Sequence, residues 1–295
     1  MTYQKRLIAG LAAALLFVGG CSNSQPSESK AEEQTKESSS PVIEQVENKE
    51  MTLPIQNWND DYTELKAEET RDGKYTGQLV DGVPSGQGKF ESQNPEGIKW
   101  YYEGEFTDGR MTGVGKSVLE DEDTIDLEGH FTNYAFTPTK TEWYKFATYT
   151  DTQHFNTAVS PDETTLSMIE ANPDYFPAVN DTSKSKVKNL VDSSIEYKHL
   201  SKNVMPYRGK FIYFKNQYVA QTFSYTLWGH AYTSILTCDQ SYNDYHYLTY
   251  YGDVDVYEGD TIAFVAVPYS SSSFENTGGG DTNVITEIAS IIVKS

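Results

Sequence analysis

The pattern of hydrophobic and polar positions divides the chain into stretches of different character. Residues 7–18 are almost all apolar, whereas residues 22–50 are rich in Ser, Glu, Gln and Lys and hold few apolar side chains. From residue 73 onward, alternating apolar positions and β-rich runs between turn signals dominate, as is typical of strands. Helical signals appear at least once between the repeat and the C-terminal region, over about 160–172 and 184–191. The pattern predicts a mainly β fold behind a polar N-terminal segment.

An internal repeat organises residues 73–133. Its copies recur after 27 and then 25 residues, and they begin with Tyr75-Thr76-Gly77-Gln78-Leu79, Tyr102-Glu103-Gly104-Glu105-Phe106 and Leu127-Glu128-Gly129-His130-Phe131. In the first two copies three further glycines also align, Gly82, Gly86 and Gly88 with Gly109, Gly113 and Gly115. Glycines permit close stacking and positive φ at turns. The repeat resembles the MORN family, although MORN units are typically shorter, and the resemblance implies a ribbon of stacked β-hairpins over residues 61–135.

A partly helical bridge is expected over residues 136–193. Ser160, Pro161 and Glu163 combine an N-cap, a proline at the first helical position and a capping-box glutamate, which predicts a helix that ends before Asn172-Pro173. Residues 184–191 predict a second short helix. The bridge separates the repeat from a second β-rich region.

The sequence of residues 194–295 predicts a small β-barrel. The motifs are Tyr207 with Gly209 before a strand, and Glu258-Gly259-Asp260 before the apolar run 262–267. This region resembles the tRNA-anti-like OB-fold domain of bacterial lipoproteins, which implies an OB-like β-barrel. We expect Phe211, Ile262 and Phe264 in its core.

The N-terminus carries an export signal. Lys5 and Arg6 precede the apolar run 7–18, which is shorter than the roughly 20 residues that a membrane span needs. Val18-Gly19-Gly20-Cys21 resembles a bacterial lipobox, which implies a signal peptide over 1–20 and a diacylglyceryl group on Cys21. Two acyl chains are enough for stable anchoring. The resemblance therefore implies a lipoprotein on the extracellular face of a cell membrane, held by a disordered tether over 21–60.

Charge limits the classes of possible binding partner, and cysteine content limits the possible disulfides. The chain has 43 acidic against 23 basic residues, for a net charge of −20, which disfavours nucleic acid and anionic lipid. The acids 120–123 are predicted to be a solvated face, with calcium binding as the alternative. Apart from Cys21 only Cys238 is present, so no intramolecular disulfide is expected, as is common in Gram-positive exported proteins. We expect Cys238 to be buried, with a reactive thiol as the alternative.

Catalytic motifs are missing from the sequence. The five histidines stand singly, and neither H-E-x-x-H nor G-x-S-x-G occurs. We therefore predict no enzyme activity, no metal and no cofactor. Aromatic residues are dense between 213 and 251, and Tyr225, Trp228 and Tyr232 are the candidate ligand contacts, with Tyr225 and Trp228 exposed near a long connection after the first barrel strand. The alternative is that these rings belong to the barrel core.

The sequence thus predicts a non-enzymatic lipoprotein that acts as a binding or scaffolding module at the cell envelope. Its OB-like barrel would bind a glycan or a peptide. The alternative is an accessory or immunity-type lipoprotein that acts through a protein partner in secretion or wall maintenance.

Overall fold

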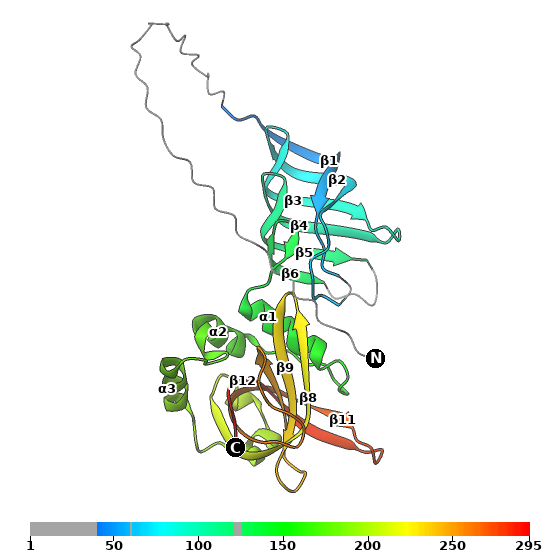
Figure 1. The fold of residues 1–295 in the computed structure, drawn as a ribbon. Coiled ribbons are helices and arrows are strands. Elements are labelled where there is room, and N and C mark those ends of the chain that lie inside the picture. The colour runs from blue at the N-terminus through cyan, green and yellow to red at the C-terminus, as the bar shows by residue number, and fades with distance from the viewer. Residues whose placement is uncertain (1–39, 60, 121–125) are drawn as a thin grey trace, which may run out of the picture. The chain divides into compact units, whose positions relative to one another are not determined.

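The computed structural model describes residues 40–59, 61–120 and 126–295. The predicted signal peptide, Cys21 and the tether up to residue 39 lie outside these residues. Residues Pro41–Ser295 form one compact unit that is mainly β, which confirms the predicted fold class. Figure 1 follows the chain through a first sheet, a set of short helices and a barrel. Within the described ranges, every helix is too short or too polar to cross a membrane.

The first sheet has seven antiparallel strands in chain order: β1 (Ile43–Ile55), β2 (Glu69–Val80), β3 (Val83–Gln93), β4 (Lys99–Thr107), β5 (Arg110–Leu119), β6 (Leu127–Thr132) and β7 (Ala135–Phe136). Asp81-Gly82, Asp108-Gly109 and Asn133-Tyr134 each form a two-residue turn with both φ angles positive. Such turns match the right-handed twist of the strands that they join. The three copies of the repeat are therefore three hairpins of one twisted sheet.

A tyrosine lying over a glycine is the packing unit of the repeat. Tyr75 and Tyr102 are fully buried, and their hydroxyls donate to the carbonyl oxygens of Gln78 and Glu105 at 3.0 and 3.1 Å. A Cβ on Gly88 would lie 2.7 Å from the Tyr75 ring, so only glycine leaves room there. The glycines that align in the sequence thus create the space that the tyrosine of each preceding strand fills.

We expect Gly104→Val to lower the free energy of unfolding by about 1–3 kcal/mol or more. A Cβ at Gly104 would lie 2.6 Å from the Tyr102 hydroxyl and 2.7 Å from the Val114 carbonyl oxygen. Gly113→Val should cost a similar amount for a different reason, because Gly113 has a φ of +76°. Urea unfolding of the full chain measures both. Glu103→Val, at an exposed position of the same strand, is the control; a Gly104→Val midpoint equal to that of the control would contradict the close stacking.

The predicted tether ends earlier than residue 60. Its described part forms β1, which pairs with β2 from Ile43 opposite Val80 to Ile55 opposite Glu69. Leu53 and Ile55 are buried, but the first half of the strand is exposed. An edge strand needs few apolar residues, because its backbone bonds to a neighbour that is already in place. The low apolar content of this segment therefore led to a prediction of disorder, although the segment adds a strand to the repeat sheet.

Helices α1 (Lys140–Asp151), α2 (Glu163–Ala171) and α3 (Asp181–Leu190) link the sheet to the barrel, and 3-10 turns follow at Pro173–Tyr175 and Met205–Tyr207. The cap of α2 was predicted wrongly: Asp162, not Ser160, accepts from the Thr165 amide, so the helix begins two residues later. Helix α1 was not predicted at all. Its Thr139 and Glu142 form a full capping box, which is a sequence signal that could have found it.

The barrel consists of β8 (Ile212–Leu227), β9 (His230–Cys238), β10 (Tyr245–Tyr251), β11 (Thr261–Glu275) and β12 (Asp281–Lys294), with α4 (Tyr197–Lys202) before it. It closes in the order β10-β12-β11-β8-β9, and only β10 and β12 are parallel. Phe211, Ile262 and Phe264 are buried, as predicted, and so is Cys238. The turns predicted at 258–260 and 278–280 precede β11 and β12.

One hydrophobic core runs through repeat, bridge and barrel. It includes Tyr102 and Phe136 from the repeat sheet, Trp143 from α1, and Trp228 and Tyr269 from the barrel. The Trp143 indole N–H donates to the Leu227 carbonyl oxygen at 3.1 Å. Helix α1 therefore ties the two β regions together through buried aromatic contacts.

Candidate functional site

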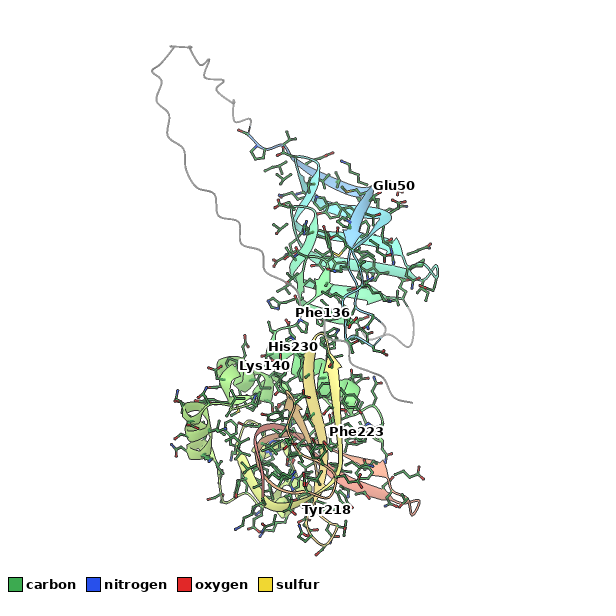
Figure 2. The ribbon with its side chains drawn as sticks, in the orientation of Figure 1. Glu50, Phe136, Lys140, Tyr218, Phe223 and His230 are labelled. Carbon is green, nitrogen blue, oxygen red and sulfur yellow. The ribbon has the colours of Figure 1, made fainter. Side chains whose placement is uncertain are left out.

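The predicted ligand contacts on the barrel do not lie together on its surface. Tyr225 is 45% exposed, but Trp228 and Tyr232 are each only 5% exposed. The expectation that Trp228 is exposed in a long connection is therefore wrong. Strand β8 continues to Leu227, and Trp228-Gly229 is a two-residue hairpin turn with φ angles of 49° and 73°. Figure 2 marks this hairpin by Tyr218 and Phe223 on β8 and His230 at the start of β9.

Trp228 packs against the repeat sheet and the bridge. Its ring lies 4.9 Å from Phe136, 5.4 Å from Phe146 and 5.9 Å from Tyr62, all in edge-to-face geometry. Its backbone N–H donates to the Tyr62 carbonyl oxygen at 2.7 Å. Edge-to-face aromatic pairs add to the stabilisation that burial provides. Trp228 is thus a structural residue, which was the alternative that the sequence left open.

A buried carboxyl interacts electrostatically with Tyr225 and Tyr232. Asp151, near the end of α1, accepts a hydrogen bond from Ser234 on β9. Burial raises the pKa of Asp151 to about 6, although hydrogen bonds from Ser234 and Tyr247 oppose the rise. The native state therefore binds more protons than the unfolded chain between the ordinary value of 3.8 and about pH 6.

We expect Asp151 to make stability fall as the pH rises from 4 to 7. The shift corresponds to a contribution on the order of 3 kcal/mol to the free energy of unfolding. This contribution is fully present below pH 3.8 and is lost by about pH 6. Asp151→Asn keeps an acceptor for Ser234 and removes the titration. Urea unfolding at pH 4, 5.5 and 7 should show the wild type losing stability relative to this variant; parallel pH profiles would contradict the assignment.

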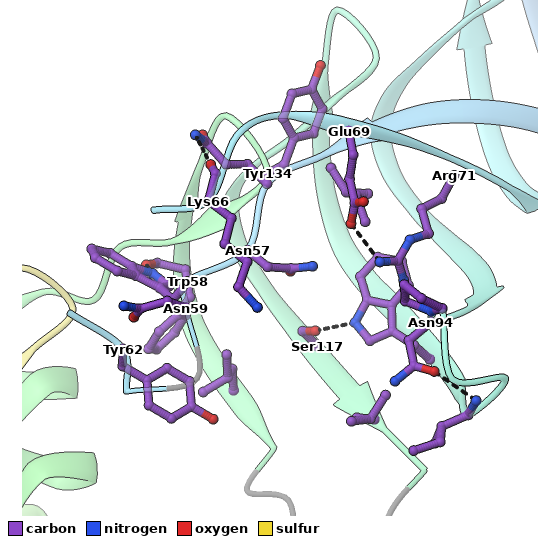
Figure 3. A pocket seen from close by; sticks show the side chains of 18 of the residues that line it. Asn57, Trp58, Asn59, Tyr62, Lys66, Glu69, Arg71, Asn94, Ser117 and Tyr134 are labelled. Atoms are coloured by element: carbon purple, nitrogen blue, oxygen red, sulfur yellow. Dashed lines mark hydrogen bonds and ion pairs between the residues drawn. The ribbon is translucent and has the colours of Figure 1, made fainter. Parts of the chain in front are cut away.

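A cavity lies on the repeat sheet. It is lined by residues of the repeat sheet, among them Arg71, Trp100 and Phe131, and by residues of the segments 56–59 and 61–66, which together are called the strap here. We call the cavity the strap pocket; its volume is about 630 Å³. Figure 3 shows Trp58, Asn59 and Tyr62 of the strap on one side and Arg71, Asn94 and Ser117 of the sheet on the other, with Asn57 between them.

Two indole rings in the strap pocket are held in place by their own N–H groups. Trp58 donates to the Phe136 carbonyl oxygen at 2.9 Å, and Trp100 donates to the Ser117 hydroxyl at 2.7 Å. Both rings are partly buried and pack against the core. Their ring orientations are therefore set before any ligand arrives, which lowers the entropic cost of binding.

The charges of the strap pocket balance. Its lining includes two basic residues, Lys66 and Arg71, and two acidic ones, Glu69 and Glu96. Arg71 pairs with Glu69 at 2.6 Å and donates to the Gln93 carbonyl oxygen at 3.2 Å. This pairing leaves no strong net charge to attract an ion. The pocket suits a ligand that is polar but uncharged.

Side-chain amides supply the remaining polar groups, from Gln56, Asn57, Asn59 and Asn94. Asn59 caps its own loop through Thr63 and Glu64, and the Asn94 carbonyl accepts from the Ile98 amide. Among the described residues, the Asn57 side chain and the Asn94 Nδ2 group have no hydrogen-bond partner. Two amides are therefore available to a ligand between two fixed indoles.

Sequence reasoning missed this pocket because it assigned residues up to 60 to the tether. A signal was present: Leu53 and Ile55 alternate, and Trp58 follows them in an otherwise polar stretch. A lone tryptophan at the end of a short alternating run is more typical of a packed segment than of a disordered one.

A buried histidine–glutamate pair occupies the barrel interior. His246 on β10 and Glu287 on β12 lie 2.8 Å apart, and neither is accessible to solvent. Burial raises the pKa of Glu287, and His246 partly opposes the rise. Elsewhere in the described ranges, His130 bonds to Glu142 and His230 to Tyr251. No three His, Cys, Asp or Glu side chains gather there in a way that could hold a metal ion.

Comparison with protein families identifies the repeat. Residues 75–94 and 102–124 match the family model of the MORN repeat. The first match covers β2 from Tyr75 and all of β3, and the described part of the second covers most of β4 and all of β5. Comparisons with curated proteins and with solved structures find no significant match. The chain therefore contains MORN repeats, as the glycine register predicted.

Proposed function

We propose that this protein is a non-enzymatic lipoprotein that binds a glycan of the cell envelope in the strap pocket. The observation that carries the proposal is the pocket itself: two indoles fixed by their own hydrogen bonds, with unpartnered amide groups between them. A volume of about 630 Å³ falls in the range of small-molecule sites. It accommodates a few sugar rings.

The chemistry of the lining favours a neutral saccharide over a charged ligand. Sugar rings present apolar C–H faces that pack on aromatic rings, and hydroxyl and acetamido groups at their edges that bond to amides. The strap pocket pairs Trp58 and Trp100 with Asn57 and Asn94 in this way, while Arg71 is already occupied by Glu69. A strongly acidic ligand would also be repelled by a chain whose net charge is −20.

The barrel and the anchor complete the proposal. The five-stranded closed barrel with one parallel pair, β10 with β12, supports assigning residues 194–295 to the OB-fold. The lipobox-like sequence at Cys21 supports anchoring to the outer face of the cell membrane. The repeat sheet would then present the pocket to the wall, with the barrel as its scaffold.

The experiment is a fluorescence titration of the full chain in detergent with a soluble N-acetylhexosamine tetrasaccharide. Binding should change the emission of Trp58 and Trp100 and saturate. Asn57→Ala should weaken binding about tenfold or more, because it removes an amide group that would hydrogen-bond to the bound saccharide. Asn283→Ala, an exposed asparagine on β12, is the matched control. Equal affinity of both variants, or no saturation by the tetrasaccharide, would rule out the strap pocket as a glycan site.

Anchoring is tested separately. Cys21→Ala should release the protein from membranes into the medium, because the acyl chains would be lost and the described residues hold no membrane-spanning helix. Fractionation of cells followed by a high-salt wash measures this. Persistence of the variant in the membrane fraction would disprove the lipobox assignment while leaving the glycan proposal intact.

A further inference from the structure

The β8–β9 hairpin leaves one strand edge without a partner. Strand β8 pairs with β11 only from Ile212 to Tyr218, whereas its pairing with β9 continues to Leu227. Between Gln221 and Thr226 all residues but Thr222 are exposed, the longest such run in any barrel strand. The second half of β8 is therefore bonded on one side only.

The register of the hairpin places backbone groups at that edge. Leu227 and His230 close the two-residue turn, so hydrogen-bonded pairs with β9 recur at every second residue from Leu227. The N–H and C=O groups of Thr222, Ser224 and Thr226 then point away from β9. In the part of the chain that the structure describes, no hydrogen bond satisfies them. We call these three residues the β8 edge.

The other long arm of the barrel is protected. Strand β11 also extends past its pairing with β8, yet Asn156 donates to the Ser273 carbonyl oxygen at 2.8 Å. Ser272 bonds to Thr157, and Arg208 donates to the Tyr269 carbonyl oxygen at 2.7 Å. Proteins normally cover or blunt exposed edges, because an open edge is a template for a further strand. The β8 edge is therefore open, whereas the corresponding edge of β11 in the same barrel is covered.

A groove runs beside the β8 edge. It has a volume of about 580 Å³ and is lined by Thr222, Ser224 and residues 253–257. Asp253 and Asp255 are exposed on this wall. Lys294, which also interacts electrostatically with Asp255, is bonded to Asp260 at 2.7 Å. The groove is therefore acidic on one side and presents strand backbone on the other.

The opposite face of β8 is aromatic. Phe223 and Tyr225 are 44% and 45% exposed, and their rings stack with centroids 6.1 Å apart. A strand added at the β8 edge would turn alternate side chains toward these rings and toward the two aspartates. Its sequence should therefore alternate apolar and basic residues.

We infer that the β8 edge is a docking site for an extended peptide of a partner protein, in which apolar and basic residues alternate. The peptide adds a strand to β8, its backbone bonding to Thr222, Ser224 and Thr226, with its basic side chains facing Asp253 and Asp255. Strand addition of this kind takes affinity from the main chain and specificity from alternate side chains. A second copy of this chain fits poorly, because it would bring the same aspartates together. This inference is independent of the strap pocket.

The test uses the full chain in detergent and three synthetic peptides of about eight residues, long enough for one strand. The first alternates valine and lysine, the second alternates valine and glutamate, and the third is the lysine peptide with N-methylated alternate amides. Fluorescence anisotropy should show binding of the lysine peptide. The other two should bind at least about tenfold more weakly, the second through charge repulsion and the third through lost backbone hydrogen bonds.

Ser224→Pro is the decisive variant, because it removes one outward N–H at an edge position where proline is tolerated. It should weaken binding of the lysine peptide about tenfold or more, whereas Ser224→Ala should change it less than about twofold. Asn57→Ala should have no effect, which separates this site from the glycan pocket. If Ser224→Pro unfolds, Asp253→Asn with Asp255→Asn replaces it and should weaken binding and reduce its salt dependence.

Several results would overturn the inference. They are equal binding of the lysine peptide to Ser224→Pro and Ser224→Ala, equal binding of the N-methylated peptide, and no binding of the lysine peptide at millimolar concentration. A dimer of the full chain that Ser224→Pro dissociates would assign the β8 edge to self-association instead of a partner peptide.

Discussion

Trp228→Ala is expected to lower the free energy of unfolding by about 3–5 kcal/mol, the usual cost of removing a buried tryptophan. The ring contacts Phe136 of the repeat sheet and Phe146 of α1. Alanine in its place would leave a cavity between three segments that are distant in the chain. The collapse that could fill such a cavity is opposed by the hairpin turn, whose backbone is fixed by the hydrogen bond to Tyr62.

Urea unfolding followed by far-ultraviolet circular dichroism measures this cost. Tyr225→Ala is the matched control, because it removes an exposed aromatic ring from the same hairpin and should cost less than about 1 kcal/mol. A Trp228→Ala variant as stable as Tyr225→Ala would mean that the ring does not join repeat and barrel. The barrel aromatics would then again be candidates for ligand binding.

His246→Leu should cost a similar amount, about 3–5 kcal/mol, through a different mechanism. It leaves the Glu287 carboxyl inside the barrel without its partner, the imidazole that packs against Phe214 and Phe264. The pKa of Glu287 is already raised by burial, and losing His246 raises it further. A carboxyl with a raised native-state pKa loses stability as the pH rises above its unfolded value. The deficit of the variant should therefore be larger at pH 8 than at pH 5.

The double variant His246→Leu with Glu287→Met distinguishes an unpaired charge from lost packing. Replacing a buried polar pair by apolar residues of similar volume is often neutral or stabilising, so the double variant should recover most of the stability and lose the added pH dependence. A double variant less stable than His246→Leu alone would show that shape, and not charge, sets the cost. Thermal and urea unfolding at the two pH values provide the comparison.

The candidate sites show where sequence reasoning reached its limit. Tyr225 was correctly placed at the surface, but Trp228 and Tyr232 were assigned to binding because aromatic density has the same appearance in a core and in a binding face. The strap pocket was missed because Trp58 lies beside a polar stretch. In both cases the exposure of a ring depends on a residue that is distant in the chain. Phe136 contacts both Trp58 and Trp228.

The sequence alone determined those features whose causes are local. The glycine register of the repeat predicted the hairpins, because a glycine that must clear a tyrosine or adopt positive φ cannot be replaced in any copy. The uninterrupted apolar run 262–267 placed Ile262 and Phe264 in the core, where Phe211 was also correctly predicted. The predicted Cys21 anchor rests on sequence alone. The tertiary structure decided that residues 43–55 join the sheet, that α1 forms, and that Trp228 joins repeat to barrel. These features take their stability from contacts between segments that are distant in the chain. The local sequence of an edge strand, of a helix poor in helix-forming residues or around a single ring shows only one of the two partners in such a contact.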